Sequence, residues 1–146
     1  MLLTVVLAIA GCDRKIVYHH YEPTSLAGWE KDDTLFFVVR RVPQTAVLRR
    51  DVELRTDGSY PFQSLSLIVE QTTFPAGLTR RDTLDCRLVT PDGTVTGRGI
   101  TLYQYRFPLP TASLTRGDSV CLSIRHNMRR ETLTGIADVG IRLTAY

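Results

Sequence analysis

The chain has 146 residues, of which 43% are hydrophobic and 23% charged, so composition predicts one globular domain and excludes a disordered chain. The formal net charge is only +3, and basic residues alternate with acidic ones in Arg49–Glu53 and Arg80–Asp82. A small and evenly scattered charge argues against nucleic acid as a partner.

An uncharged apolar run opens the chain and ends in Ala10 and Gly11, directly before Cys12. About ten apolar residues form about 15 Å of helix, half of what a bilayer core requires, which excludes a stable membrane span. The run therefore predicts a lipoprotein signal peptide, with lipid attachment at Cys12. The alternative is an N-terminal core strand with a chance cysteine, since no basic residue precedes the apolar run.

We divide the chain into three parts: a signal peptide (1–11), a lipidated tether with an edge segment (12–25) and a β-sandwich domain (26–146). Residues 34–42 are apolar on both faces in the middle, which predicts a central strand covered on both sides. Residues 46–56 place charges of alternating sign on one face, which predicts a strand with a wet face.

Further alternation over residues 64–70 and 139–145 predicts half-buried strands. Turn chemistry punctuates these runs at Asp57-Gly58, at Pro91–Gly93 and at Arg116–Asp118, so neighbouring strands should be antiparallel. Beyond the signal peptide, no stretch has sustained helical periodicity. Seven to nine short strands predict an all-β, two-sheet antiparallel β-sandwich or jelly roll.

Several aromatic residues have two readings. Trp29 is either a stacking platform for a sugar or partner, or a ring that covers the sandwich core. Tyr60 begins either a rigid aromatic turn or the closure of the core at a sheet corner. Tyr103, Tyr105 and Phe107 share one face, either in the core or on a flat binding surface.

A disulfide between Cys86 and Cys121 is allowed but not implied, because an exported protein meets an oxidising environment. Cys86 shares the apolar face of its strand, whereas Cys121 lies opposite the aliphatic residues of its own strand. The two sulfurs therefore meet only where these opposite faces converge.

The sequence contains no nucleophile elbow, zinc-protease motif, phosphate-binding glycine loop or paired-cysteine motif. His19 and His20 are adjacent and point to opposite faces of an extended segment, and His126 stands alone, so we interpret all three as solvated surface residues. These observations predict a protein that is not an enzyme and has no metal site and no cofactor.

Four segments together carry a family resemblance: Cys12-Asp13, residues 29–37, residues 54–65 and residues 128–142. They resemble the GldH gliding motility lipoproteins of Bacteroidetes in order and spacing. The turn at Tyr60-Pro61 and the ending over residues 135–140 are the most specific pieces. The chain departs from the family at Gln63-Ser64, where relatives more often carry an asparagine before the leucine.

The resemblance implies an envelope lipoprotein that supports the gliding apparatus, a system linked with type IX protein secretion, and gives a role only to Cys12, as the lipid attachment site. Surface-exported lipoproteins of this phylum tend to carry an acidic cluster after the lipidated cysteine, whereas Asp13–Lys15 is net basic. We therefore expect an outer-membrane anchor and a domain that faces the periplasm.

Two functions follow from these patterns. The first is a non-enzymatic scaffold or adaptor that binds envelope proteins of the gliding or secretion machinery through a sheet edge or a loop patch. The second is a carbohydrate-binding lipoprotein that stacks sugars on exposed aromatic rings. The candidate residues for a partner or ligand surface are Trp29, Tyr60, Met128 and Arg129.

Overall fold

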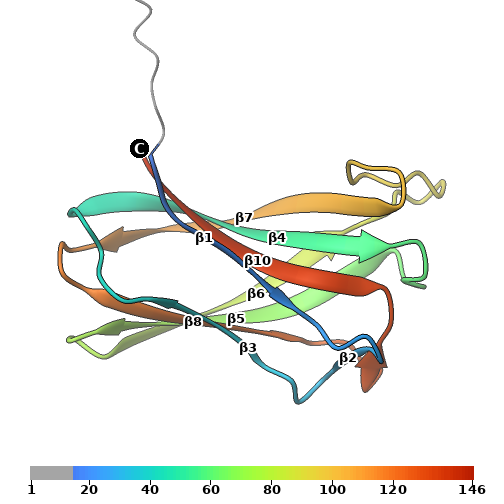
Figure 1. Ribbon diagram of the computed structural model, residues 1–146, viewed down its shortest axis with the longest axis horizontal. Helices are drawn as coiled ribbons and strands as arrows, with labels where there is room; N and C mark the ends of the chain where they lie inside the picture. The colour runs from blue at the N-terminus through green and yellow to red at the C-terminus, as the bar shows by residue number, and fades with distance from the viewer. Residues whose placement is uncertain (1–14) are drawn as a thin grey trace, which may run out of the picture.

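The computed structural model describes residues 15–146, which form a two-layer β-sandwich without helices (Figure 1). The predicted all-β antiparallel sandwich is thereby confirmed. Two of the ten strands are only two residues long. The strands are β1 (Ile16–Pro23), β2 (Trp29–Glu30), β3 (Leu35–Val39), β4 (Ala46–Asp57), β5 (Ser64–Phe74), β6 (Leu78–Arg87), β7 (Leu102–Leu114), β8 (Ser119–His126), β9 (Thr132–Leu133) and β10 (Ile136–Ala145).

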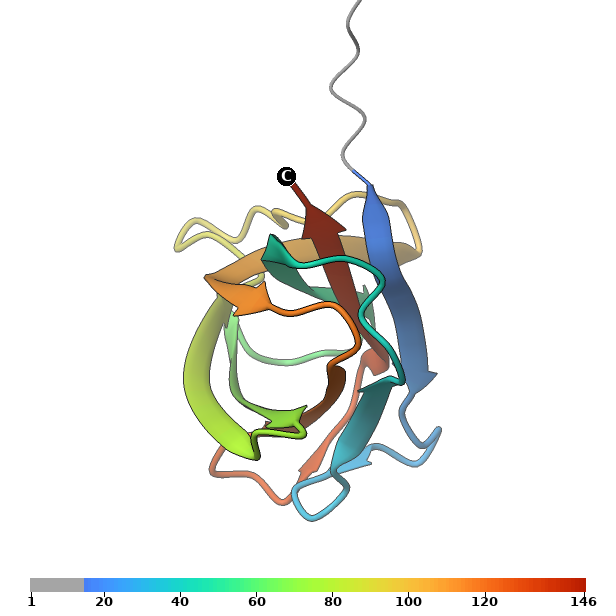
Figure 2. The same ribbon diagram turned by 90° about the vertical axis from the view of Figure 1, so that its left-hand side faces the viewer.

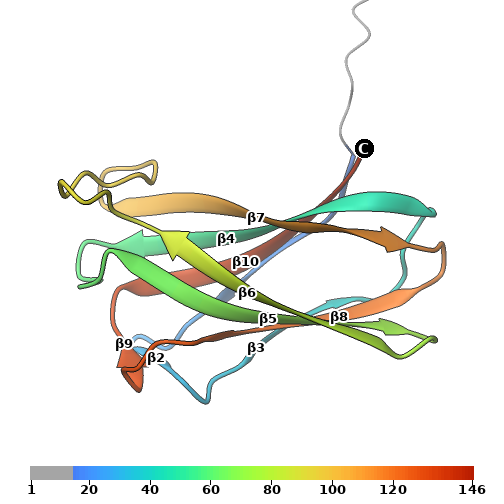
Figure 3. The ribbon, with the colours of Figure 1, turned by 180° about the vertical axis from the view of Figure 1, so that it is seen from behind.

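Two four-stranded antiparallel sheets make the layers. One has the strand order β1-β10-β4-β7 and is called the β4 sheet here; the other has the order β3-β8-β5-β6 and is called the β5 sheet. The short strands β2 and β9 pair with each other at one end of the sandwich (Figure 3). The β1 strand, at one edge of the β4 sheet, lies within the segment for which an edge strand is expected.

The pairing of strands follows a jelly-roll order. The first long strand pairs with the last, and the next pairs follow inward along the chain: β1 with β10, β3 with β8, β4 with β7, and β5 with β6. These pairs alternate between the two sheets, as they do when a long antiparallel ribbon is rolled up. The chain consequently begins and ends side by side, and the Ala145 amide donates a hydrogen bond of 2.8 Å to the Lys15 carbonyl.

The sandwich has two ends that carry different loops. At the end where the described chain begins, which we call the proximal end, Ala145 pairs with Leu48 and Leu48 with Ala112. The other end, the distal end, carries the segments that precede β3 and β10. The proximal segments are 40–45, 75–77 and 115–118, and the distal segments are 24–34, 58–63, 88–101 and 127–135 (Figures 1 and 3).

The interior is built from the inward-facing residues of both sheets. It contains Trp29, for which the sequence allowed two readings, and His126, which was expected at the surface. Trp29 is fully buried, and its indole N–H donates a hydrogen bond of 2.8 Å to the Asp33 carbonyl. The ring packs edge-on against His126 at 5.3 Å between centroids. The interpretation of His126 as a solvated residue is therefore wrong.

His126 is buried because β8 places it on the same face as Val120, Leu122 and Ile124. Burial lowers the pKa of this imidazole, which favours the neutral form. The Nδ1 atom accepts a hydrogen bond of 3.3 Å from the Met128 amide, and Nε2 has no hydrogen-bond partner within the described residues.

The β3 strand corrects the expectation of a central strand covered on both sides. It lies at the edge of the β5 sheet, and Phe36 and Val38 on its outer face are 59% and 54% exposed. The inward residues Leu35, Phe37 and Val39 are buried as expected. Both faces of β3 are therefore apolar, but only the inner face is buried and the outer face is exposed.

Arg50 of β4 points into the sandwich interior, between the two sheets. Its guanidinium is almost completely buried and donates to three groups: Nε to the Pro110 carbonyl at 2.7 Å, Nη1 to Gln71 Oε1 at 3.0 Å, and Nη2 to Asp82 Oδ2 at 2.9 Å. Gln71 lies on β5 and Asp82 on β6. A single side chain therefore joins the β4 sheet to two strands of the β5 sheet.

We expect Arg50→Met to lower the free energy of unfolding by about 1.5–3 kcal/mol, because it removes a buried charged donor and leaves the Asp82 carboxylate with only the more exposed Arg80, whose Nε lies 3.4 Å away. Adding Asp82→Leu should recover part of this loss, since the carboxylate that has lost its buried partner is then removed. Chemical denaturation of both single variants and the double variant measures the coupling.

The control is Arg81→Met, which removes an exposed arginine paired with Glu70 at 2.8 Å. An exposed pair contributes at most about 1 kcal/mol. Equal stability of Arg50→Met and Arg81→Met would contradict the structural role of Arg50.

Candidate functional site

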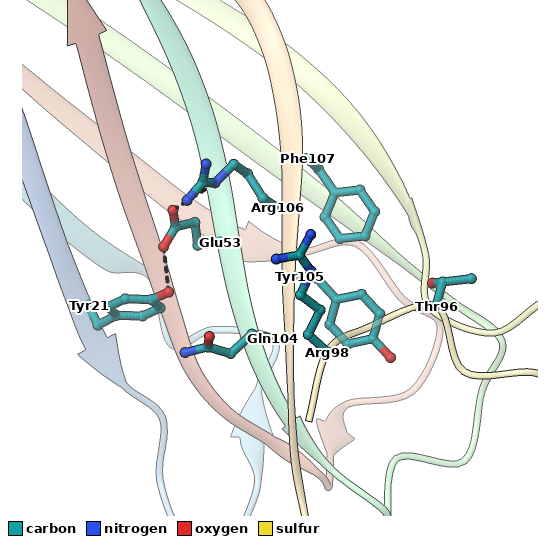
Figure 4. A pocket seen from close by; sticks show the side chains of 8 residues that line it. All are labelled: Tyr21, Glu53, Thr96, Arg98, Gln104, Tyr105, Arg106 and Phe107. Carbon is teal, nitrogen blue, oxygen red and sulfur yellow. Dashed lines mark hydrogen bonds and ion pairs between the residues drawn. The ribbon is translucent and has the colours of Figure 1, made fainter. Parts of the chain in front are cut away.

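A polar hollow lies on the β4 sheet, where β7 meets the distal segment 88–101 (Figure 4). Its volume is about 560 Å³, within the range of small-molecule sites in proteins. Side chains from β1, β4, β7 and the 88–101 segment line it: Tyr21, Glu53, Thr96, Arg98, Gln104, Tyr105, Arg106 and Phe107.

Glu53 is the buried charge of this hollow, and its two carboxylate oxygens accept hydrogen bonds from both sides. Oε2 accepts from His19 Nε2 at 2.8 Å and from the Tyr21 hydroxyl. Oε1 accepts from Arg106 Nε at 3.0 Å, and Arg142 Nη1 lies 3.8 Å away. Four strands of the β4 sheet therefore converge on one carboxylate.

A glycine makes this convergence possible. Backbone pairing aligns Tyr21, Gly140, Glu53 and Arg106 in one row across β1, β10, β4 and β7. A Cβ at Gly140 would come within 2.8 Å of the Tyr21 ring. Because Gly140 has no side chain, the Tyr21 ring crosses β10 and its hydroxyl reaches Glu53.

Glu53 and Tyr21 of the hollow have pKa values far from neutral pH. Burial alone would raise the pKa of Glu53, but hydrogen bonds from Tyr21 and His19, together with the nearby positive charges, lower this pKa below its ordinary value. Burial, followed by the hydrogen bond to Glu53, raises the pKa of Tyr21 to about 12. The carboxylate thus stays ionised and the phenol stays protonated, which suits binding better than proton transfer.

The sequence-predicted surface residues fall into two groups. Trp29 belongs to the core and is not a surface residue, which corrects its place among the candidates. Tyr60, Met128 and Arg129 meet at the distal end, on the segments 58–63 and 127–135. With Phe62 and Arg130 they form what we call the distal patch.

Contacts within the distal patch and with the neighbouring β5 strand fix its two segments. Gly135 has a φ of +88°, and a Cβ there would collide with the backbone of Tyr60. Met128 Sδ accepts a hydrogen bond of 3.4 Å from the Ser66 amide. The Tyr60 and Phe62 rings lie 5.7 Å apart, and the Arg130 guanidinium lies 5.9 Å from the Phe62 ring.

The cysteines do not form the disulfide that the sequence left open. Cys86 is a buried free thiol on β6, and Cys121 is a partly exposed free thiol on the outer face of β8. β5 lies between these strands, and the two side chains point to opposite faces of the sheet. Burial raises the pKa of Cys86 to about 12, so its thiol stays protonated.

Metal sites and membrane-spanning helices are two further features of interest in residues 15–146. Cys12 lies outside the described residues. Among residues 15–146, no group of three or more His, Cys, Asp or Glu side chains is placed to hold a metal ion. The same residues contain no helix of the length and apolarity that a bilayer crossing requires.

Sequence reasoning missed the Glu53 network. The alternation in β4 placed Glu53 on the outer face, which is correct, but predicted that this face is wet. Asp51 and Glu53 are in fact buried by side chains from the neighbouring strands. The one available signal was Gly140 inside a strand pattern, because an internal strand glycine marks a close approach.

Sequence comparisons with known proteins match almost the whole chain. Residues 16–143 match the sequence model of the family described as GldH lipoprotein. A curated relative, the gliding motility lipoprotein GldH of Flavobacterium johnsoniae, is 31% identical over 98% of this chain and 93% of its own length.

Among solved structures, the VP2 subviral particle of infectious bursal disease virus matches with a TM-score of 0.39 and 16% identity, and a structure of the Gx strain of this virus matches with 0.33 and 14%. The matches cover 99% and 88% of this chain. The chain spans only 37% and 29% of those viral chains.

Replacing Glu53 by glutamine (Glu53→Gln) should lower the free energy of unfolding at pH 7 by about 1–3 kcal/mol, because the donors around the carboxylate lose their charged acceptor. The folded pKa of Glu53 lies below its ordinary value of 4.5. Its contribution is therefore complete above about pH 4.5 and is lost as the pH falls through the lower folded value.

Thermal melts between about pH 3 and pH 7 should show a weaker pH dependence in Glu53→Gln than in the wild type. Glu70→Gln is the matched control, since Glu70 carries a partly exposed pair with Arg81. An unchanged acid slope in Glu53→Gln would disprove the role of this carboxylate.

Proposed function

Because this chain belongs to the GldH lipoprotein family, we propose that it is a lipid-anchored component of the cell envelope that supports gliding motility. The name of the Flavobacterium johnsoniae relative supports this role. In our proposal the lipid is attached to Cys12, the anchor lies in the outer membrane, and the domain faces the periplasm. The protein then serves gliding or the associated type IX secretion machinery.

The domain acts as an adaptor that binds another envelope protein through the distal patch. The observation that supports this most directly is the contact of the Tyr60 ring and the Arg130 guanidinium with Phe62, next to the exposed Arg129. The segments that carry these residues lie at the end of the sandwich away from the start of the described chain (Figure 1). A surface that combines aromatic rings and guanidinium groups is typical of protein interfaces. The partner surface should therefore be acidic and partly apolar.

A role without catalysis fits the titratable groups of the hollow. Glu53 is held as a carboxylate and Tyr21 as a phenol, so neither is suited to exchange a proton near neutral pH. Cys86 is buried and its pKa is raised to about 12, which disfavours the nucleophilic thiolate. These directions support a binding protein.

Carbohydrate binding in the hollow is a second candidate function. The volume of about 560 Å³ and the mixture of Tyr21, Arg98 and Gln104 side chains favour it. Trp29 does not contribute, because it is buried. Glycan-array binding that is lost in Gln104→Ala and kept in the distal-patch variant would favour this function over the adaptor.

Crosslinking in cells followed by capture of the full-length protein tests the adaptor. We expect the wild type to recover a component of the gliding or secretion machinery. Arg129→Glu combined with Arg130→Glu should reduce that recovery at least about tenfold, as loss of interfacial hot-spot residues does. Cys12→Ala should lose the lipid anchor and, with it, most of this recovery.

The matched control is Arg81→Glu combined with Arg87→Glu, which makes the same charge change on exposed residues of β6. This control should keep the recovery of the wild type. Equal recovery by the wild type and by the distal-patch variant would disprove binding through this surface.

A further inference from the structure

Three exposed apolar side chains lie together at the proximal end. Ile16, Val47 and Tyr146 are 47%, 46% and 76% exposed. Ile16 pairs with Thr144, and the next residue of β10, Ala145, pairs with Leu48. The three residues therefore lie within two register positions of one another, at the ends of the neighbouring strands β1, β10 and β4.

Four basic residues lie on the segments of the same end. Lys15 precedes β1, Arg40 and Arg41 lie in the 40–45 segment, and Arg116 lies in the 115–118 turn; all four are exposed. Two backbone hydrogen bonds join the segment to the turn, from the Val42 amide to the Asp118 carbonyl at 2.7 Å and from the Gly117 amide to the Val42 carbonyl at 2.9 Å. The arginines of the two loops are thus fixed at one end.

The two ends of the sandwich differ in charge. At the proximal end, Lys15 and the three joining segments carry four basic residues and one acidic residue, Asp118, whose carboxylate accepts a hydrogen bond of 3.0 Å from the Thr115 amide. The distal segments carry four basic and five acidic residues: Lys31, Arg98, Arg129 and Arg130 against Glu30, Asp32, Asp33, Asp92 and Glu131. The positive charge therefore lies where the chain begins.

The anchor of the proposed function would sit close to this end. Three residue steps separate Cys12 from Lys15, and a fully extended chain covers about 11 Å in that distance. A domain of this size has a radius of gyration of about 14 Å. A lipid on Cys12 would therefore bring some part of the proximal end into contact with the bilayer surface.

We propose that the proximal end is a membrane-contact surface: Ile16, Val47 and Tyr146 enter the headgroup region, and Lys15, Arg40, Arg41 and Arg116 bind anionic phospholipid headgroups around them. The proposal rests on the proposed lipid attachment at Cys12. Apolar side chains and a ring of cations are the two parts of an interfacial binding surface. The contact orients the domain with the proximal end, which Figure 2 views end-on, toward the membrane and the distal patch away from it.

Fluorescence quenching by lipids tests the orientation in the acylated full-length protein. Tyr146→Trp places an indole in the contact surface, and Phe62→Trp places one in the distal patch as the matched control. In vesicles of phosphatidylcholine and phosphatidylglycerol, brominated acyl chains should quench the emission added at position 146 and not that added at position 62. Emission from Trp29 in the wild type is the background to subtract.

Equal quenching of both positions, or of neither, would overturn the proposal. The proposed anchor is scored separately, by sedimentation of the same protein with the vesicles. Protein that sediments without quenching at position 146 refutes the contact surface alone. Protein that does not sediment and carries no lipid on Cys12 refutes the anchor and the proposed function with it.

Charge variants of the unacylated chain without the apolar signal peptide, residues 12–146 with Cys12→Ala, test the headgroup contact without the lipid. The chain should bind vesicles containing phosphatidylglycerol and not vesicles of phosphatidylcholine alone, and salt should weaken this binding. Neutralising two arginines with Arg40→Gln and Arg41→Gln should weaken it by about thirtyfold.

The matched control, Arg129→Gln with Arg130→Gln, removes two adjacent arginines at the distal end and should leave vesicle binding unchanged. An equal loss in both double variants would show that net charge alone drives binding and would overturn the proposal. Binding that does not depend on phosphatidylglycerol would overturn it as well.

Discussion

The arrangement of this molecule depends on the pairing of its first strand with its last. Because β1 lies against β10 and β10 against β4, the start of the chain is fixed at one end of the sandwich and the loops after β4 and β8 at the other. The Arg50 side chain then joins the two sheets through the interior, with hydrogen bonds to Gln71 and Asp82. Strand pairing thus sets the positions of the proximal and distal ends, and the buried hydrogen bonds of Arg50 help to hold the two sheets together.

Much of the fold could be predicted, because alternation along a strand is local information. The inward faces of β5, β8 and β10 follow directly from apolar residues at every second position. Alternation did not show which apolar face another layer covers, and so Phe36 and Val38 were expected inside. It also did not show that Arg50 finds partners 21 and 32 residues away in the sequence.

The candidate site could be predicted only in part for the same reason. Tyr60, Met128 and Arg129 were selected from the sequence and meet at the distal end, yet their proximity depends on two loops about 70 residues apart. The carboxylate of Glu53 accepts hydrogen bonds from two other strands and lies 3.8 Å from a cation on a third, and no single segment of the sequence records this arrangement. His126 shows the opposite case: its position two residues after Ile124 is compatible with burial, yet it was interpreted as a solvated residue.

The hydrogen bond between Ala145 and Lys15 has a practical consequence for engineering. Because the two ends of the described chain are neighbours, a short peptide joining them would leave the strand order intact, and new termini opened at the exposed residues 91–95 would give a circular permutant. For the same reason, a reporter fused after Tyr146 would crowd the region where the chain starts, whereas an insertion in the 88–101 segment would leave that region free.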